Sequence, residues 1–183
     1  MNKMKKIFLA ALVCTGAATN VNAQALATAT ATATIITPIS ISKTADMDFG
    51  NIAVSASAGG TVTLEASAAA TRTPSAGGGV TLPSTTGTVS AAQFDVTGTA
   101  NFTYDIALPP NATLTFGANA MSLENFKTSL ADPGNPADAG TAGTLDGSGE
   151  QSFYLGADLL VDAGQAPGVY TTSSPFFVAV NYN

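Results

Sequence analysis

The side chains that most often carry out chemistry in proteins are nearly absent from this chain. It contains no histidine, and Cys14 is its single cysteine. Histidine is the commonest general base and metal ligand, and a Ser-His-Asp arrangement requires it. The lack of histidine excludes a Ser-His-Asp triad. A single cysteine excludes a zinc site built from several thiolates and a disulfide within the chain.

Carboxylates are the chemical groups that remain. Asp46 and Asp48 are two residues apart, a spacing that places both side chains on one face of a strand. Nothing around them indicates a cleft, so we expect an acidic pair that faces solvent at a strand end. We therefore expect no catalytic residue and no cofactor-binding residue.

A second set of oxygen ligands lies in a stretch rich in Gly, Pro, Ala and Asp. The set is Asp132, Asn135, Asp138, Asp146 and Glu150. Such ligands suit calcium, but their spacing is not that of an EF-hand loop. We expect a solvated loop over residues 131–149 and no metal site, although the sequence alone leaves calcium binding open.

Residues 1–23 have the pattern of a secretory signal. Lys3, Lys5 and Lys6 precede a short apolar stretch over residues 7–18, and a small-residue cleavage pattern ends at Ala23. The apolar stretch is shorter than the ~20 residues of a membrane-spanning helix. We expect export through the Sec pathway, a location in the periplasm, at the cell surface or outside the cell, and no transmembrane segment after cleavage.

The exported part is strongly acidic. Lys43, Arg72 and Lys127 are its only basic residues, against twelve acidic ones, so its formal charge is 3 − 12 = −9. Nucleic acids and anionic membrane surfaces are bound through basic patches. The charge therefore argues against both as partners.

Period-two alternation marks the segment that follows the signal. From Ala25 to Phe49 most odd positions are apolar, and Thr or Ser fills many of the even ones. This pattern is typical of an extended strand with one buried face, but the run is too long for one ordinary strand. We expect residues 24–34 to form an extended Ala/Thr leader. It is either added as a strand to a shallow groove, paired within its own domain, or left as a loose Thr-rich segment. Its candidate side chains are Ala25, Ala27, Ala29, Ala31 and Ala33.

Residues 35–183 are expected to form one β domain. Short alternating runs such as 93–98 and 101–108 are separated by turn signals rich in Gly and Pro. Residues 123–130 allow one helical turn. Many short strands with such connections favour an antiparallel sandwich, and we predict an immunoglobulin-like one of about 7–9 strands.

Several motifs resemble a secreted bacterial family, domain-of-unknown-function family 4402. Residues 39–50 resemble its opening motif and residues 91–98 its central motif. Residues 153–159, 168–170 and 178–182 resemble its last third. The resemblance covers about residues 35–183, but the family has no established activity.

The end of the chain is more loosely similar to spore-coat-U-type and chaperone–usher pilins. Phe176, Val178, Val180 and Tyr182 alternate in the manner of the terminal strand of these pilins, and a Gly-x-Tyr motif at residues 168–170 precedes them. Those domains are immunoglobulin-like sandwiches that lack one strand, which a neighbour's extension supplies. The resemblance implies self-association or related surface subunits as partners, and a periplasmic chaperone. The missing disulfide and the small leader side chains depart from that pattern.

The sequence therefore supports two hypotheses about function. The first is a non-catalytic structural or adhesion-type protein of the cell surface, assembling by β-strand addition as pilins do. The alternative is a secreted monomeric module that binds a glycan or a surface partner. An enzyme is the least favoured reading, because the chain has no histidine.

Overall fold

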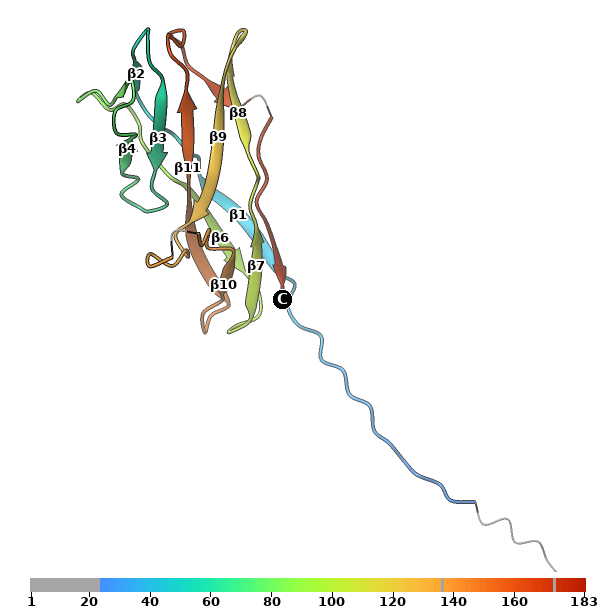
Figure 1. Cartoon of the computed structure of the whole chain (residues 1–183). Helices are drawn as coiled ribbons and strands as arrows, with labels where there is room; N and C mark the ends of the chain where they lie inside the picture. Colours follow the sequence, from blue (N-terminus) through green and yellow to red (C-terminus); the bar gives the residue numbers. More distant parts are fainter. Residues whose placement is uncertain (1–23, 136, 173) are drawn as a thin grey trace, which may run out of the picture. The chain divides into compact units, whose positions relative to one another are not determined.

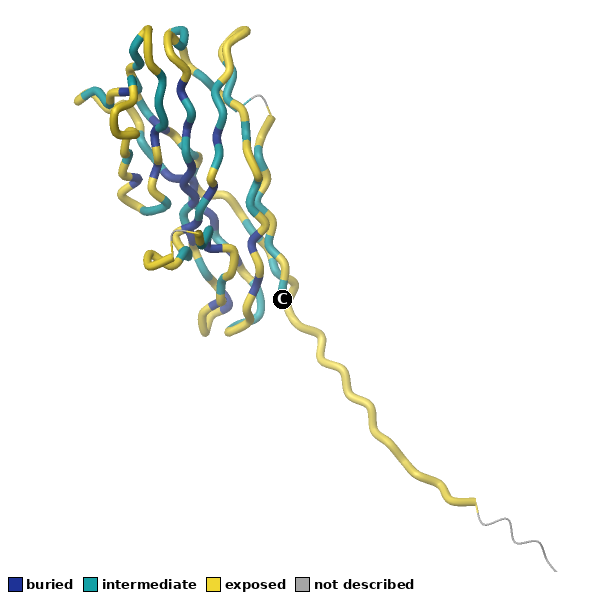
Figure 2. The backbone as a smooth tube through the Cα atoms, viewed as in Figure 1, coloured by how far each residue is buried: buried dark blue, intermediate teal, exposed yellow. Residues whose placement is uncertain are grey.

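The computed structural model describes residues 24–135, 137–172 and 174–183. The chain divides into two units, Met1–Thr34 and Ile35–Asn183. In the first unit, residues 24–34 form neither helix nor strand, and all of them are exposed (Figure 2). The predicted signal lies outside the described residues.

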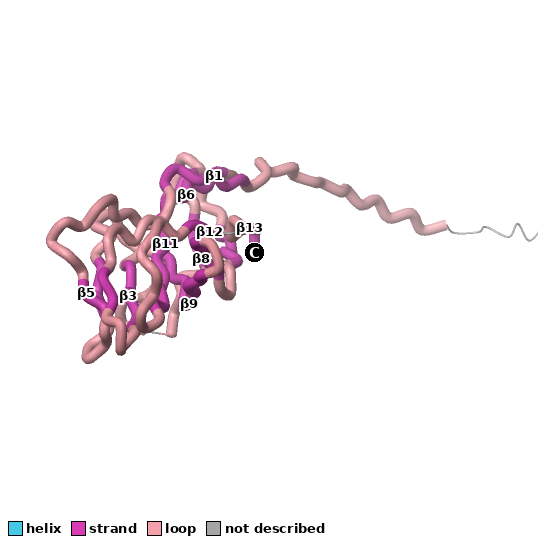
Figure 3. Tube along the Cα trace, turned by 90° about the horizontal axis from the view of Figure 1, so that it is seen from above, coloured by secondary structure: helices cyan, strands magenta, loops and turns pink. Residues whose placement is uncertain are grey.

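The second unit consists of strands and loops, with no helix among the described residues (Figure 3). Its strands are β1 (Ser40–Ala45), β2 (Ala53–Val54), β3 (Gly60–Leu64), β4 (Arg72–Pro74), β5 (Val80–Thr81), β6 (Ala92–Thr97), β7 (Thr103–Ala107), β8 (Ala112–Phe116), β9 (Asn119–Thr128), β10 (Ala142–Thr144), β11 (Glu150–Val161), β12 (Thr171–Thr172) and β13 (Ala179–Tyr182). No described helix is long and apolar enough to cross a membrane.

All strand pairs in the described residues are antiparallel. The largest sheet has the order β1-β6-β11-β9-β8-β12, with β3 on β11 and β4 on β3. A second sheet has the order β10-β7-β13, and β2 pairs with β5. The predicted all-β, sandwich-like fold is confirmed. Thirteen strands exceed the predicted number, because breaks divide long strands into short ones.

Strand β11 organises the core. Its first half pairs with β6 and its second half with β3, while β9 lies along the opposite edge. Phe153 of β11 stands directly opposite Phe94 of β6, and their rings stack with centroids 5.5 Å apart. Figure 2 shows the buried backbone concentrated along these central strands. Burial of such side chains from water is the main stabilising contribution to the fold.

The sequence prediction was wrong over residues 123–130, which lie largely in strand β9. One extra residue on β9 shifts the register between Gly156 and Asp158 of β11, where three steps along β9 stand against two along β11. Asn125 lies there with φ 53°, in the left-handed region that Asn tolerates better than most residues. The extra residue puts Leu123 and Phe126 on the same buried face, a spacing of three that imitates a helix.

The prediction of an unstructured stretch over residues 131–149 was also too broad. Strand β10 lies inside it and pairs with β7. Ala142 stands opposite Asp105 and Thr144 opposite Thr103. The loop proper is therefore divided into two parts by a short strand.

Strands β12 and β13 share a common register with their partner strands. Thr171 stands opposite Thr115 of β8, and Ala179 stands opposite Ala107 of β7. Thr171 and Ala179 are eight residues apart, and their partners Thr115 and Ala107 are also eight residues apart. The register of β12 on β8 is therefore the same as that of β13 on β7. Figure 1 shows the red segment running along the same side of the domain as β7 and β8. Strands β12 and β13 therefore keep one register on β8 and β7, although they belong to different sheets.

Two prolines explain why this long pairing is interrupted. The common register places Pro109 and Pro110 opposite Phe177 and Phe176. Proline has no backbone N–H and cannot donate to the neighbouring strand. The pairing therefore stops at the prolines and resumes beyond them without a change of register.

Candidate functional site

One long sheet edge has the properties of a pairing site. We call residues 171–182 the terminal strand, and its outer side the terminal edge. Among the described residues, this strand pairs only with β8 and β7, and β1 contacts β13 without pairing with it. It contains no charged residue and a single proline, Pro175. Long edges without charge or bulges readily accept another strand.

Side chains alternate along the terminal strand in the way a half-buried strand requires. Phe176, Val178, Val180 and Tyr182, the four predicted positions, are all half-buried and pack against the core. Phe177, on the other face, is 79% exposed. The inward row is thus covered only in part, in contrast to the fully buried residues of the central strands.

The hydroxyl of Tyr182 closes one end of the terminal edge. It accepts a hydrogen bond from the Thr99 N–H at 2.6 Å and donates one to the Thr37 carbonyl at 2.9 Å. The Thr37 N–H donates in turn to the Thr99 hydroxyl at 3.0 Å. The Tyr182 ring also packs edge-on against Phe102, with centroids 5.6 Å apart. These contacts fix the residues that follow the leader to the end of the terminal strand.

Gly98 makes room for the Tyr182 hydroxyl. A Cβ at this position would lie 2.2 Å from the hydroxyl oxygen and 2.9 Å from Leu145 Cδ1. Neither distance is possible, so a side chain at residue 98 would displace the tyrosine. Sequence analysis placed Gly98 in a strand pattern but gave it no role, because its partner is 84 positions away.

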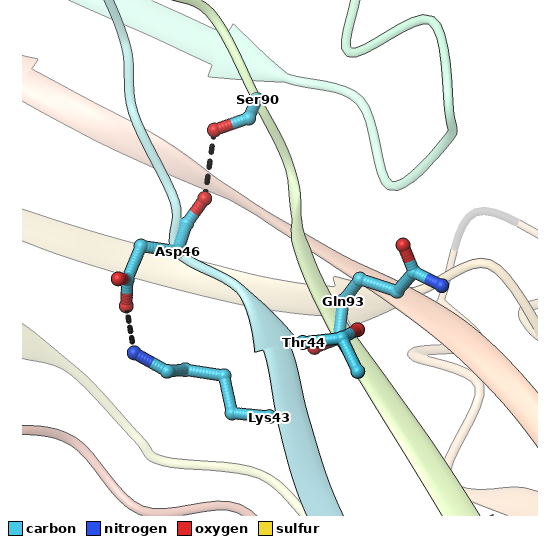
Figure 4. Close-up of polar contacts among 5 residues, drawn as sticks. All are labelled: Lys43, Thr44, Asp46, Ser90 and Gln93. Carbon is cyan, nitrogen blue, oxygen red and sulfur yellow. Dashed lines mark hydrogen bonds and ion pairs between the residues drawn. The ribbon is translucent and has the colours of Figure 1, made fainter.

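Strand β1 forms a second edge but is protected differently. It pairs only with β6 among the described residues, with an irregular register between Lys43 and Ala45. Figure 4 shows the Lys43 ammonium beside the Asp46 carboxylate, and the Ser90 hydroxyl donating to the Asp46 carbonyl. The Thr44 hydroxyl donates to the Gln93 carbonyl across the strands. A charged side chain and an irregular register both discourage the addition of a further strand.

The acidic residues singled out in the sequence serve local structure. Both Asp46 and Asp48 are exposed, as expected, but they have separate partners. Asp46 is paired with Lys43, and Asp48 accepts the Gly50 N–H at 2.7 Å. The pair therefore forms no carboxylate dyad.

In the loop over residues 131–149, the carboxylates of Asp138 and Asp146 accept hydrogen bonds from backbone N–H groups of nearby residues. Hydrogen bonds from the Asp132 and Gly140 N–H groups lower the pKa of Asp138, and those from Glu150 and Ser148 lower the pKa of Asp146. No three acidic side chains in the described part of the chain come together to hold a metal ion.

A polar hollow of about 530 Å³ lies over β3, β9 and β11. Asp158 lines it, and both of its carboxylate oxygens are occupied: one accepts the Thr63 hydroxyl at 2.6 Å and the other the Asn125 amide at 2.9 Å. Lys127 and Ser129 also line it, and no aromatic residue does. Sequence analysis missed this hollow, because it depends on the extra residue at Asn125.

The leader residues proposed as a donor segment belong to the other unit. Ala25, Ala27, Ala29, Ala31 and Ala33 are exposed and take part in no strand pair among the described residues. Their backbone groups are therefore not engaged in any ladder of this chain.

Comparison with known proteins identifies the family. The sequence model of the family described as domain of unknown function DUF4402 matches residues 39–182. The chain belongs to the DUF4402 family. The match begins just before β1 and ends at Tyr182, so the DUF4402 domain includes both sheet edges and excludes the leader. No curated protein and no solved structure matches the chain.

Proposed function

We propose that this DUF4402 protein is an exported, non-catalytic structural protein that assembles through strand pairing at the terminal edge. The observation that carries the proposal is the uncharged edge of residues 171–182, paired on one side only among the described residues. An added strand would satisfy its backbone groups and cover the half-buried inward row. Export rests on the signal pattern of residues 1–23.

The absence of histidine from the sequence supports a non-catalytic role. The carboxylates most suited to chemistry are committed to backbone N–H groups, to Lys43, or to Thr63 and Asn125. A general acid or base must be able to exchange its proton with a substrate.

The test of assembly is deletion of residues 24–34 followed by gel filtration. We expect multimers of the intact protein and monomers of the deleted one, with the same thermal unfolding of the domain. Replacement of Thr28, Thr30 and Thr32 by Ser is the matched control, because it keeps the alternation and should keep the multimers. Multimers that survive the deletion unchanged would count against the proposal.

The polar hollow favours a second candidate, binding of a neutral glycan. Hydroxyl, amide and carboxylate groups line it, and these are the groups that hydrogen-bond sugar hydroxyls. The absence of a lining aromatic residue makes it the weaker candidate, since sugar rings are commonly stacked on aromatic faces. A glycan array probed with the protein and with Asn125→Ala tests it. Binding that the substitution removes would support this candidate, and an array without hits would eliminate it.

A further inference from the structure

We infer that a second hollow, beside Arg72, binds a carboxylate carried on a short apolar group. This Arg72 hollow has a volume of about 400 Å³, and it is lined by the turn that leads into β4 and by the loop that follows β5. One lining residue, Arg72, is charged, and most of the others are apolar: Ala69, Ala70, Leu82, Pro83 and Val89. The inference goes beyond the proposed function, because none of these residues belongs to the terminal edge.

Main-chain oxygens hold the guanidinium of Arg72 in place. Its Nη1 donates to the carbonyl of Phe49 and, at 2.9 Å, to the carbonyl of Asn51. Among the residues that the structure describes, no acidic side chain forms an ion pair with it. The Nε–H and Nη2–H groups make no hydrogen bond to these residues, and together they form the fork that binds a carboxylate through two parallel hydrogen bonds. The positive charge of Arg72 is thus available to an acidic ligand.

The two walls of the Arg72 hollow are fixed to each other through residues 49–51. Arg72 binds this segment from one wall, and the Asn51 N–H donates to the Thr86 carbonyl of the other wall at 2.7 Å. Gly50, with φ 62°, permits this close approach, since a Cβ there would lie 2.2 Å from the Thr86 carbonyl oxygen. A hollow whose walls are bound to one segment is already formed before a ligand arrives, which lowers the entropic cost of binding.

Ala70 keeps a methyl group in the lining at a cost in backbone strain. Its φ is 46°, in the left-handed region that favours glycine, and its side chain is buried. Strained backbone of this kind clusters at ligand-binding sites, where the lining residue is needed for contact. The strain supports the assignment independently of the charge of Arg72.

The acidity of the chain favours a carboxylate with an apolar group over a bare inorganic anion. Twelve acidic residues repel any anion, and an inorganic anion would gain only its contact with the guanidinium. A ligand with an apolar group also buries that group against Leu82, Pro83 and Val89. A short-chain fatty acid and the C-terminus of a peptide that ends in an apolar residue share this chemistry.

Titration of the exported protein, followed by nuclear magnetic resonance at the Arg72 Nε–H and the Ala70 N–H, tests the site. Hexanoate is the probe, hexanamide lacks its charge, and acetate lacks its apolar chain. N-acetylated glycyl-glycyl-leucine, with a free or an amidated C-terminus, represents the peptide source.

Three variants accompany the titration, and Arg72 itself is retained because it holds residues 49–51. Ala69→Glu places a competing carboxylate among the lining residues. Ala68→Glu is its matched control, because Ala68 is also exposed and lies in the same turn but does not line the hollow. Ala70→Gly removes the methyl group and relieves the strain at the same time.

We expect hexanoate to shift both signals to saturation, with a dissociation constant at least tenfold lower than those of hexanamide and acetate. Ala69→Glu should weaken hexanoate binding at least tenfold and Ala68→Glu less than twofold. Ala70→Gly should weaken it about fourfold, as expected for one buried methyl group, without lowering the melting temperature.

Tighter binding of the free tripeptide than of hexanoate, with the same response to the variants, would support the site and identify the peptide as the source. Equal binding of hexanoate and hexanamide would overturn the inference, because the charge would then have no role. Equal weakening by Ala69→Glu and Ala68→Glu, or no saturable shift with either carboxylate, would also overturn it.

Discussion

The hydroxyl of Tyr182 lies 2.9 Å from the carbonyl oxygen of Thr37, although 145 residues separate them in the chain. This hydrogen bond joins the end of the terminal strand to the residues that lead into β1. It holds two edges from different sheets at the same end of the domain. Removal of the contact should affect the stability of this end of the domain.

Tyr182→Phe removes the hydroxyl and keeps the ring on Phe102. The Thr99 N–H and the Thr37 carbonyl both lose a partner, so we expect a loss of about 1–3 kcal/mol in the free energy of unfolding. Urea denaturation measures it. Tyr170→Phe is the control, because the Tyr170 hydroxyl makes one hydrogen bond to the nearby Ala166 carbonyl. Equal losses in the two variants would show that the Tyr182 contact has no special role.

Gly98→Ala should be destabilising for a steric reason. The added methyl group would overlap the Tyr182 hydroxyl and Leu145, so we expect a loss of about 1–3 kcal/mol in the free energy of unfolding. Gly147→Ala is the matched control, since no atom lies within 4 Å of the Cβ position there. Thermal unfolding of both variants decides the matter, and a similar melting temperature for the two would contradict the packing described at Gly98.

Replacement of Pro109 and Pro110 by Thr tests the common register of β12 and β13. Successive N–H groups of a strand point to opposite sides, so one of the two new amides should donate to the terminal strand. Hydrogen exchange should show that amide protected and the other exchanging rapidly. Rapid exchange at both positions would mean that residues 173–178 do not follow the register of their neighbours.

The buried Tyr104 predicts a loss of stability at high pH. Burial raises the pKa of its phenol to about 12 from the ordinary 10.0. Below pH 10 the phenol is protonated in both states and stability is unaffected. Between pH 10 and 12 only the unfolded state releases the proton, so stability should fall by about 1.4 kcal/mol per pH unit.

Denaturation at pH 9 and at pH 11 measures this effect. Tyr104→Phe should lose part of its stability at pH 9, because the Gln151 side-chain oxygen loses its 2.6 Å partner. It should then show a smaller further loss between the two pH values than the wild type. A fall that is equally steep in both proteins would assign the alkaline effect to other groups.

The sequence predicted those parts of the fold in which side chains alternate without interruption. Phe94 and Val96 are buried, and Phe176, Val178, Val180 and Tyr182 share a face, as their spacing indicated. Alternation is a local property and can be read within a few residues. The same reasoning failed at Asn125, where one extra residue changes the period and produced a false helical spacing.

Long-range relationships could not be obtained from the sequence. The partnership of Gly98 with Tyr182 and the hydrogen bonds of Asp158 to Thr63 and Asn125 depend on which strands become neighbours. The common register of β12 and β13 is kept across a Pro-Pro break, and no local pattern reveals register.

The meeting of Thr37 and Tyr182 at one end of the domain has a mechanical consequence. A pull applied between the leader and Asn183 of the same chain would act on a few side-chain hydrogen bonds and leave most of the core unloaded. A pull applied between the leader and a strand bound at Thr171 would instead pass lengthwise through the domain. The ladders of the terminal strand would then resist in shear, with many hydrogen bonds sharing the force at once.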